Sequence, residues 1–538
     1  MKTGLRTMRL AFVFGMALMI GCFLYFRYVV PYHICFKEQI QLFTFSSSYI
    51  WSYFSKPAVF ACLIGDFLTQ FFYFKTAGAA IVTLLLVAIW WLTFLTLKRF
   101  WVAVETLHAT SLRYIVSLIP VIIIWIYFPN PSFTVAWSVS FIIALFAFLI
   151  YAKTNGKTAV VVGIILIPTL YIIAGASVFL FVILAILYRM KNEELRMKNK
   201  KIKFLILYSS FLILLAIATP VILRHTYLLT LKQAYLYPYS SIKQGLTPNM
   251  EQEKLLGIII EFYHENWDKV LEIAEKSELK NPITTRYINI ALSQKSLLGE
   301  RLMDFYQPFS MGLLIPIVPG STWFTVFAGS DAYYHIGDMG MAQHAAMLGM
   351  IFSPNQRSAR MMERLVETNR TNGDTAVAAK YMRILESTLF HKIKPEKLKN
   401  LPQRVIFSED RIRNASDVKP SLELLTESNP DNLPALNYLL CYYLLTKDIP
   451  AFFNAYTKYG KGKFTSIPKV YAEALLIYFA VTKSTIKEVS SYGISPEIIK
   501  SFGEYTRLYE KSNGKLDPVQ KMFPNTYWLF YHFAVMNK

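Results

Sequence analysis

Acidic side chains are scarce in this chain of 538 residues. Asp and Glu total 35 against 56 Lys and Arg, and charged residues of both signs make up only 17%, where soluble domains average about 25%. Hydrophobic residues reach 54%, and the mean hydropathy is +0.35. This composition excludes a disordered chain and predicts a polytopic membrane protein with a water-soluble part attached.

Cysteine is rarer still, and the four residues Cys22, Cys35, Cys62 and Cys441 form no CxxC pair. Neither a disulfide framework nor a zinc site is therefore predicted, although a single bridge between Cys35 and Cys62 stays open. Glycine-rich phosphate loops and the HExxH, GxSxG and EF-hand patterns are also absent from the sequence. No basic helix carries interleaved aromatics, so we expect no nucleic-acid partner. With those motifs absent, no cofactor is predicted either.

Long apolar runs dominate residues 1–223. A bilayer core of about 30 Å needs about 20 apolar residues in a helix. Thr158–Met190 is interrupted at residues 174–176 and is interpreted as two short helices in a hairpin, although a single crossing stays open. About seven spans are predicted: Met8–Val30, Ala77–Leu97, Leu112–Phe128, Phe133–Tyr151, the two halves of Thr158–Met190, and Lys203–Leu223.

The distribution of basic residues predicts the orientation of these spans, because cytoplasmic loops are rich in Lys and Arg. The most basic loop carries Arg189, Lys191, Arg196, Lys198, Lys200, Lys201 and Lys203. Placing this loop inside, with seven spans, puts the N-terminus in the cytoplasm and everything after residue 223 outside.

The first outside loop, residues 31–76, contains two carboxylates, Glu38 and Asp66. A carboxylate close to hydrocarbon is costly unless it is paired or hydrated, so both are candidate functional residues. One interpretation is a general base or a metal-positioning acid. The other is structural: Lys37 and Lys56 neutralise the two acids, and Glu38 caps an interfacial helix.

Two further features of this loop are interpreted structurally. His33 follows the first span closely and is predicted to be an interfacial polar residue. Pro57–Phe74 is apolar but contains Asp66, Thr69 and Gln70, so an interfacial or re-entrant helix is predicted there rather than a span.

The layout of residues 1–223 resembles that of the GT-C membrane glycosyltransferases, which carry an acidic residue soon after the first span and often a soluble C-terminal domain. This resemblance implies a transferase that uses a lipid-linked sugar, for example a polyprenyl-linked one. Glu38 would be the essential acidic residue, with Asp66 second, and a divalent metal would be involved only under this hypothesis.

Helical periodicity dominates residues 224–538, with hardly any strand pattern. The pattern Tyr333-x3-Gly337-Asp338-x3-Ala342-x3-Ala346 recurs as Asn369-x3-Gly373-Asp374-x3-Ala378-x3-Met382, and weaker copies lie at residues 263–274 and 443–456. This is the spacing of a tetratricopeptide (TPR) repeat. Such an array exposes a concave groove that binds a protein or peptide, or it serves as a spacer.

A metal site in this half is not expected. His335, Asp338 and His344 are close in sequence, but the Gly-Asp turn already explains Asp338. The two histidines are predicted to lie on different sides of a helix–turn–helix.

Across nearly its full length the chain resembles a family of bacterial envelope proteins with no established activity. The residues that carry this resemblance are Glu38-Gln39-x-Gln41-Leu42-Phe43, Phe67-Leu68-x-Gln70-Phe71-Phe72, Ser358-Ala359-Arg360-x3-Arg364-Leu365 and Tyr527-Trp528. The resemblance implies the inner membrane of a two-membrane bacterium, with the soluble half in the periplasm.

The sequence therefore predicts an all-α protein with two domains. Residues 1–223 form the membrane domain, and residues 224–538 form an extracytoplasmic TPR-like domain. The leading hypothesis is a non-enzymatic envelope scaffold that sits in the lipid bilayer and binds a partner through the TPR-like domain. The alternative is a GT-C-like transferase that depends on Glu38 or Asp66.

Overall fold

A computed structural model describes residues 2–100, 107–194, 199–239, 249–318, 320–353, 356–402, 404–409 and 418–535. Within these ranges every regular element is helical and no strand is present, so the all-α prediction is confirmed. The chain forms two compact units. The first contains residues 1–253 and 384–392, and the second contains residues 254–383 and 393–538.

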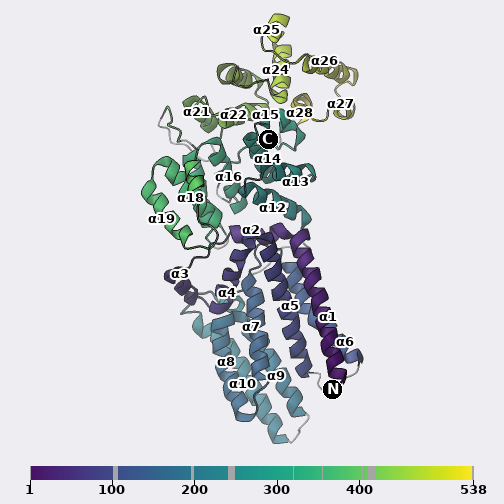
Figure 1. Cartoon of the computed structure of the whole chain (residues 1–538), viewed down its shortest axis with the longest axis vertical. Coiled ribbons are helices and arrows are strands. Elements are labelled where there is room, and N and C mark those ends of the chain that lie inside the picture. Colours follow the sequence, from purple (N-terminus) through teal and green to yellow (C-terminus); the bar gives the residue numbers. More distant parts are fainter. Residues whose placement is uncertain are drawn as a thin grey trace. The chain divides into compact units, whose positions relative to one another are not determined.

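The first unit is a bundle of long apolar helices with shorter helices between them (Figure 1). Its elements are α1 (Lys2–Leu24), η1 (Tyr25–Val29), α2 (Pro31–Gln39), α3 (Ser47–Ser52), η2 (Tyr53–Ser55), α4 (Val59–Thr69), η3 (Gln70–Tyr73), α5 (Lys75–Phe100), α6 (Leu107–Tyr127), α7 (Val135–Tyr151), α8 (Gly156–Ala174), η4 (Gly175–Ser177), α9 (Val178–Glu194), α10 (Asn199–Leu223) and α11 (Leu231–Leu236).

Four helical stretches among the described residues are long and apolar enough to cross a membrane. They are Ala11–Val29, Lys75–Phe100, Gly156–Lys191 and Leu205–Leu223. Leu112–Tyr127 and Val135–Tyr151 are apolar but shorter. The prediction of seven spans and of their orientation stays a prediction. Of the basic loop on which the orientation depends, Arg196 and Lys198 lie outside the described residues.

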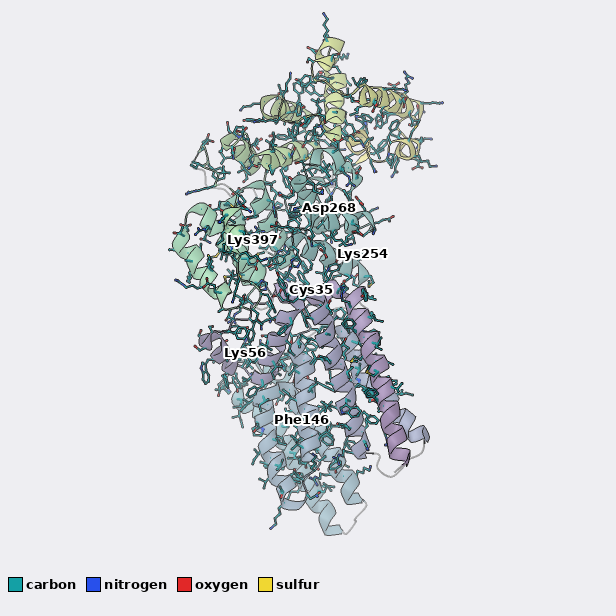
Figure 2. The ribbon with its side chains drawn as sticks, viewed as in Figure 1. Cys35, Lys56, Phe146, Lys254, Asp268 and Lys397 are labelled. Carbon is teal, nitrogen blue, oxygen red and sulfur yellow. The ribbon has the colours of Figure 1, made fainter. Side chains whose placement is uncertain are left out.

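The long helices are apolar on both their inward and their outward faces. On α7, Ala144 and Phe148 are fully buried, whereas Phe146 and Ile150 are exposed, and Figure 2 marks Phe146 in the bundle. A water-soluble bundle would place polar side chains at the outward positions. Such an exposed apolar face is the kind of surface that a membrane helix presents to lipid.

Helices α8 and α9 are antiparallel and form a hairpin. Near the start of α7, Ser140 donates a hydrogen bond to the carbonyl of Ala174, where α8 ends. Near the end of α7, Arg189 of α9 donates to the carbonyl of Thr154, at 2.7 Å. Since the two contacts lie at opposite ends of α7, the chain reverses at Gly175, whose φ is +64°.

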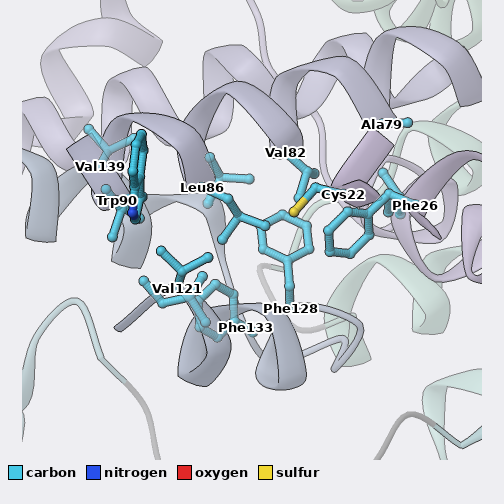
Figure 3. Close-up of a cluster of buried hydrophobic side chains, with 14 of the residues drawn as sticks. Cys22, Phe26, Ala79, Val82, Leu86, Trp90, Val121, Phe128, Phe133 and Val139 are labelled. Carbon is cyan, nitrogen blue, oxygen red and sulfur yellow. The ribbon is translucent and has the colours of Figure 1, made fainter. Parts of the chain in front are cut away.

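The first unit has two buried apolar clusters, one between α1, α5, α6 and α7 and the other between α7, α8, α9 and α10. Figure 3 shows Phe26 and Phe128 beside Val82, with Trp90 further along α5. The rings of Phe26 and Phe128 meet edge to face, with centroids 5.8 Å apart, a favourable aromatic arrangement. Cys22 lies in the first of these clusters as a small apolar side chain, and all four cysteines are free, so Cys35 and Cys62 form no bridge.

The second unit consists of short helices connected by tight turns. They are α12 (Met250–Tyr263), α13 (Trp267–Glu275), α14 (Pro282–Gln294), α15 (Leu298–Arg301), η5 (Leu302–Asp304), η6 (Phe309–Gly312), α16 (Trp323–Ile336), α17 (Met339–Phe352), α18 (Ala359–Asn372), α19 (Thr375–Glu386), α20 (Pro395–Lys399), α21 (Val418–Ser428), α22 (Leu433–Leu445), α23 (Ile449–Ala455), η7 (Tyr456–Gly460), α24 (Lys469–Thr482), α25 (Ile486–Ser490), α26 (Pro496–Lys511), α27 (Leu516–Met522) and α28 (Tyr527–Phe533). Helix α12 begins, and helix α19 ends, with residues that belong to the first unit.

The Gly-Asp turn between α16 and α17 has the local geometry expected from the sequence. Gly337 ends α16 with φ +92°, a left-handed conformation that glycine adopts readily. Asp338 then caps α17 by accepting from the backbone N–H of Met341 at 3.2 Å. Ala342 and Ala346 are fully buried, as close helix packing requires. The assignment of the whole unit to the TPR class nevertheless stays a prediction.

Candidate functional site

Helix α2 carries the strongest candidate residue, Glu38, and is buried along nearly its whole length. Pro31 starts the helix at a position where a missing N–H is harmless. The helix packs against η3 and α5. A methyl group added at Gly78 of α5 would come 2.8 Å from the side chain of Ile34, so the two helices are in close contact.

Glu38 is buried and pairs with a histidine that lies 353 residues further along the chain. Its carboxylate contacts Nε2 of His391. His391 belongs to residues 384–392, a short strap that is part of the first unit. In this strap the carbonyl of Ser387 accepts from the N–H of Phe45 at 2.8 Å. Phe390 stacks on Tyr73 with ring centroids 5.6 Å apart.

A second histidine–carboxylate pair lies at the N-terminal end of α2. The carboxylate of Glu253 accepts from the backbone N–H groups of Tyr32 at 2.8 Å and His33 at 3.0 Å, and it also contacts the His33 ring. Because the first N–H groups of a helix have no partner within the helix, this carboxylate caps α2. His33, predicted to be an interfacial polar residue, has a side chain that is buried within the protein and paired with Glu253.

Lys37 contacts backbone carbonyls in the turn between α6 and α7. Its ammonium donates to the carbonyls of Asn130 and Phe133, the latter at 2.7 Å. Burial lowers the pKa of Lys37 to about 7, because desolvation disfavours the charged amine. Glu38, in turn, lies in the last turn of α2 and does not cap the start of that helix.

Asp66 lies on α4 and is half-buried. Its carboxylate accepts from the hydroxyl of Tyr53 at 2.7 Å, and its backbone carbonyl accepts from Gln41 at 2.6 Å. Burial first, and then the nearby Asp66 charge, raise the pKa of the Tyr53 phenol. Gln41 thus connects the segment after α2 to α4. Both acidic candidates are engaged in contacts within the first unit.

An apolar groove of about 480 Å³ lies between α6 and α7 in the first unit. Its lining consists of Pro120, Ile123, Ile124, Tyr127, Phe133, Trp137, Phe141 and Tyr239. The volume is within the range of about 300–1,000 Å³ that is typical of small-molecule pockets. The indole N–H of Trp137 is already bonded to the carbonyl of Pro238 at 3.0 Å, so this edge of the groove has a rigid aromatic wall.

The second unit contains a buried cluster of charges around Asp331. Arg360 and Arg364 donate to its two carboxylate oxygens at 2.5 Å and 3.0 Å. Arg364 also bonds Glu367 at 2.8 Å, and Lys397, which Figure 2 labels, bonds Glu367 at 2.7 Å. Burial alone would raise the pKa of Asp331, but the two guanidinium groups outweigh it and hold the pKa below its usual value.

This cluster has no room for a substrate. The cavity beside it has a volume of about 20 Å³, enough for about one water molecule. His335 lines the same cavity, and burial, with the nearby Arg364 charge, lowers its pKa to about 3. His344, by contrast, is exposed. The described residues contain no group of three or more His, Cys, Asp or Glu side chains that could hold a metal ion.

The sequence indicated Glu38 as a candidate. It did not indicate His391, which pairs with Glu38, or Glu253, which pairs with His33 at the other end of α2. Nothing in the local sequence indicates them, because His391 lies in a short stretch between helices and Glu253 in an ordinary charged helix start. The acidic residue Asp331 was missed as well, although Arg360 and Arg364, one turn apart on α18, are the kind of pair that binds a carboxylate.

The described fold defines an all-helical protein with four apolar helical stretches that could cross a membrane. Residues 6–534 match the DUF6057 family, described as a family of unknown function. Because the match covers nearly the whole chain, the protein belongs to this family, and the prediction of a family without established activity is confirmed. No curated protein and no solved structure matches the chain.

Proposed function

We propose that this protein is a membrane-anchored scaffold whose second unit binds a protein partner. The observation that carries the proposal is an apolar strip on the second unit. On α17, Met347, Ile351 and Phe352 are exposed, and they share one face of the helix. Val377 of α19 is also exposed, and Tyr381, one turn later, reaches the sulfur of Met347 at 3.9 Å.

Exposed apolar side chains that cluster on neighbouring helices mark interaction sites more often than scattered ones do. The apolar strip is exposed, whereas the acidic candidates already have partners within the protein, and this difference supports a binding role. Glu38 and Asp66 are engaged by other side chains of the first unit, and the charge cluster around Asp331 neutralises itself. We infer that the bacterial inner membrane holds the first unit and that the second unit faces the periplasm.

Site-specific photo-crosslinking in living cells tests this function. A photoreactive phenylalanine analogue at Met347 or Ile351 is expected to give discrete protein adducts, and the same analogue at the exposed Val481 of α24 is the control. Adding Phe352→Glu should abolish the adducts, because it puts a charge into the strip. The proposal fails if positions 347 and 351 give no more adducts than position 481, or if Phe352→Glu leaves the adducts unchanged.

A GT-C-like transferase is the second candidate, and two observations favour it. Glu38, in the loop that we place on the periplasmic side of the inner membrane, forms an acid–histidine pair with His391. Such a pair is a common general-base arrangement. The apolar groove between α6 and α7 is large enough for part of a lipid chain, as a polyprenyl-linked sugar donor would require. Under this candidate Glu38→Gln abolishes turnover in a protein that still folds and inserts, whereas a scaffold tolerates that change.

A further inference from the structure

The segment between residues 46 and 56 has an unusual surface. It contains α3 and η2, which include Tyr49, Ile50, Trp51, Tyr53 and Phe54, yet neither element has a single buried residue. Trp51 is 68% exposed and Phe54 is 48% exposed. Exposing so many aromatic side chains to water is unfavourable, because removing their surface from water lowers the free energy.

The two faces of this segment differ. The hydroxyls of Tyr49 and Tyr53 bond each other at 2.8 Å, and Tyr53 also bonds Asp66 at 2.7 Å. Residues four apart share one face of a helix, so this tyrosine face is directed toward α4. Trp51 lies between the two tyrosines in sequence and therefore projects elsewhere, and its ring packs on Phe54 with centroids 5.0 Å apart. The outward face of the segment therefore carries the packed side chains of Trp51 and Phe54.

The chain that follows ties this segment to the ends of the apolar helices. The N–H of Ala58 donates to the carbonyl of Tyr171 at 3.3 Å, close to the end of α8. Gly65 of α4 approaches Ala136 near the start of α7 so closely that an added methyl group would lie 2.5 Å from its backbone nitrogen. The ends of helices that cross a membrane lie near the headgroups, and η2, which continues α3, is held to α4 by the bond between Tyr53 and Asp66. Figure 1 shows α3 at the same end of the bundle as α4.

The charge of the segment matches an interface with lipid. No Asp or Glu is present between residues 46 and 56, and the segment ends at the exposed Lys56, which Figure 2 labels. Trp and Tyr concentrate at membrane–water interfaces, where a ring can sit among the headgroups, and lysine pairs there with lipid phosphates. Just beyond, α4 exposes Phe60 and Ile64, one turn apart, which continues the apolar surface.

We propose that α3 and η2 form a membrane-interface anchor, in which Trp51 and Phe54 insert into the headgroup–acyl boundary and Lys56 lies at the phosphates. The anchor holds α4 and the segment after α2 at a fixed depth, through the contacts of Asp66 with Tyr53 and Gln41. This anchor is independent of both proposed functions, because a scaffold and a transferase could each contain a membrane-interface anchor. Its partner is the phospholipid surface rather than another protein.

Depth-dependent fluorescence quenching tests the anchor. The full-length protein carrying Trp51→Cys is labelled with an environment-sensitive nitrobenzoxadiazole dye and reconstituted into vesicles of phosphatidylethanolamine and phosphatidylglycerol. The wild type measures background labelling of the native cysteines, of which Cys22, Cys35 and Cys441 are buried. Val481→Cys, on an exposed side chain of α24, is the matched control. Ser52→Cys, which keeps Trp51, serves if replacing Trp51 prevents folding.

We expect dye emission from position 51 or 52 that is shifted to the blue of that from position 481. Phospholipids with a spin label near the headgroup should quench it more strongly than those with a spin label near the chain end. Water-like emission without quenching would overturn the proposal. Blue-shifted emission that neither lipid quenches would overturn it too, because a second copy or another protein would then cover the segment.

Discussion

Glu38, Glu253 and Asp331 are buried carboxylates, and each is matched by a histidine or by arginines. An unpaired buried carboxylate costs several kcal/mol, so such matches are required for the fold to be stable. The four segments that carry the family resemblance include Glu38, Arg360 and Arg364, together with the buried pair Tyr527 and Trp528. At these positions the resemblance therefore points to residues that hold the structure together.

Asp331→Asn tests the importance of the charge cluster. The substitution removes the carboxylate that Arg360 and Arg364 contact at 2.5 Å and 3.0 Å, and breaking a buried ion pair costs about 3–5 kcal/mol. We expect a clear fall in the thermal unfolding temperature of the purified full-length protein in detergent. Asp268→Asn, which removes a highly exposed partner of Lys295, is the control and should change little. Equal effects of the two changes would show that the cluster is not important for stability.

Glu473 gives the stability of the protein a specific dependence on pH. The residue is buried on α24, where its carboxylate accepts from the N–H of Tyr527 at 2.6 Å. Burial raises its pKa from 4.5 to about 7, although the Tyr527 hydrogen bond opposes the shift. A raised carboxyl pKa means that the folded state binds the proton more tightly, so the contribution of Glu473 to stability is fully present below pH 4.5 and is lost as the pH rises to about 7.

Glu473→Gln removes this titration and keeps an oxygen for Tyr527. The pKa difference corresponds to about 3 kcal/mol. The unfolding temperature of the wild type should therefore fall between pH 5 and pH 8 by more than that of the variant, measured by scanning fluorimetry. Glu504→Gln, at an exposed position on α26, is the control and should follow the wild type. Parallel pH profiles for wild type and Glu473→Gln would contradict the burial of this carboxyl group.

Residue types and local turns were predictable from the sequence, but long-range pairs were not. The apolar neighbourhood of Glu38 and Asp66 was sufficient to identify both acids as candidates. Their partners were not identifiable, because a hydrogen bond between positions 38 and 391 leaves no periodic trace in either segment. Lys37, expected to neutralise a carboxylate, binds the carbonyls of Asn130 and Phe133 instead.

At the scale of single elements, α4 depends on the absence of a side chain at Gly65. An added methyl group would lie 2.5 Å from the backbone nitrogen and 2.8 Å from the Cα of Ala136 on α7. Backbone atoms cannot move aside as a flexible side chain can, so Gly65→Ala must separate α4 from α7, at a cost of about 1–3 kcal/mol or more.

Fluorescence-detected gel filtration after heating measures the effect of this change. Gly65→Ala should lower the temperature at which the monodisperse peak is lost. Gly21→Ala on α1 is matched in chemistry, but no atom lies within 4 Å of the added methyl group. If Gly65→Ala behaves like Gly21→Ala, then α4 is not packed on α7 as described.

Helix ends were the most predictable elements. The Gly-Asp pairs at 337–338 and 373–374 indicated turns, and both glycines have φ +92°. The weaker copy at residues 443–456 lacks the glycine, yet the chain turns at the same place, with Lys447 at φ +60° and Asp448 as the cap. Packing of the flanking helices therefore overrides the local preference there. A pattern search that requires glycine would miss this turn.

At the scale of the whole molecule, the open prediction is the orientation of the chain in the membrane. Seven spans with the basic loop inside place the C-terminus outside. An alkaline phosphatase fused after Lys538 should then be active, and a fluorescent protein fused there should be dark. Fusions after Lys191 should behave in the opposite way. A bright C-terminal fluorescent fusion would overturn the orientation and, with it, the periplasmic assignment of the second unit.

The central claim is that Glu38 is a structural residue and that the protein acts by binding rather than by catalysis. Profiling lipid-linked sugars in a deletion strain, complemented with wild type or with Glu38→Gln, tests this most directly. The account predicts that deletion leaves the lipid-linked sugars unchanged. It also predicts that Glu38→Gln, whose amide oxygen can still accept from His391, inserts and folds as the wild type does. Accumulation of a lipid-linked precursor that the wild type clears and folded Glu38→Gln does not would contradict the account and establish the transferase.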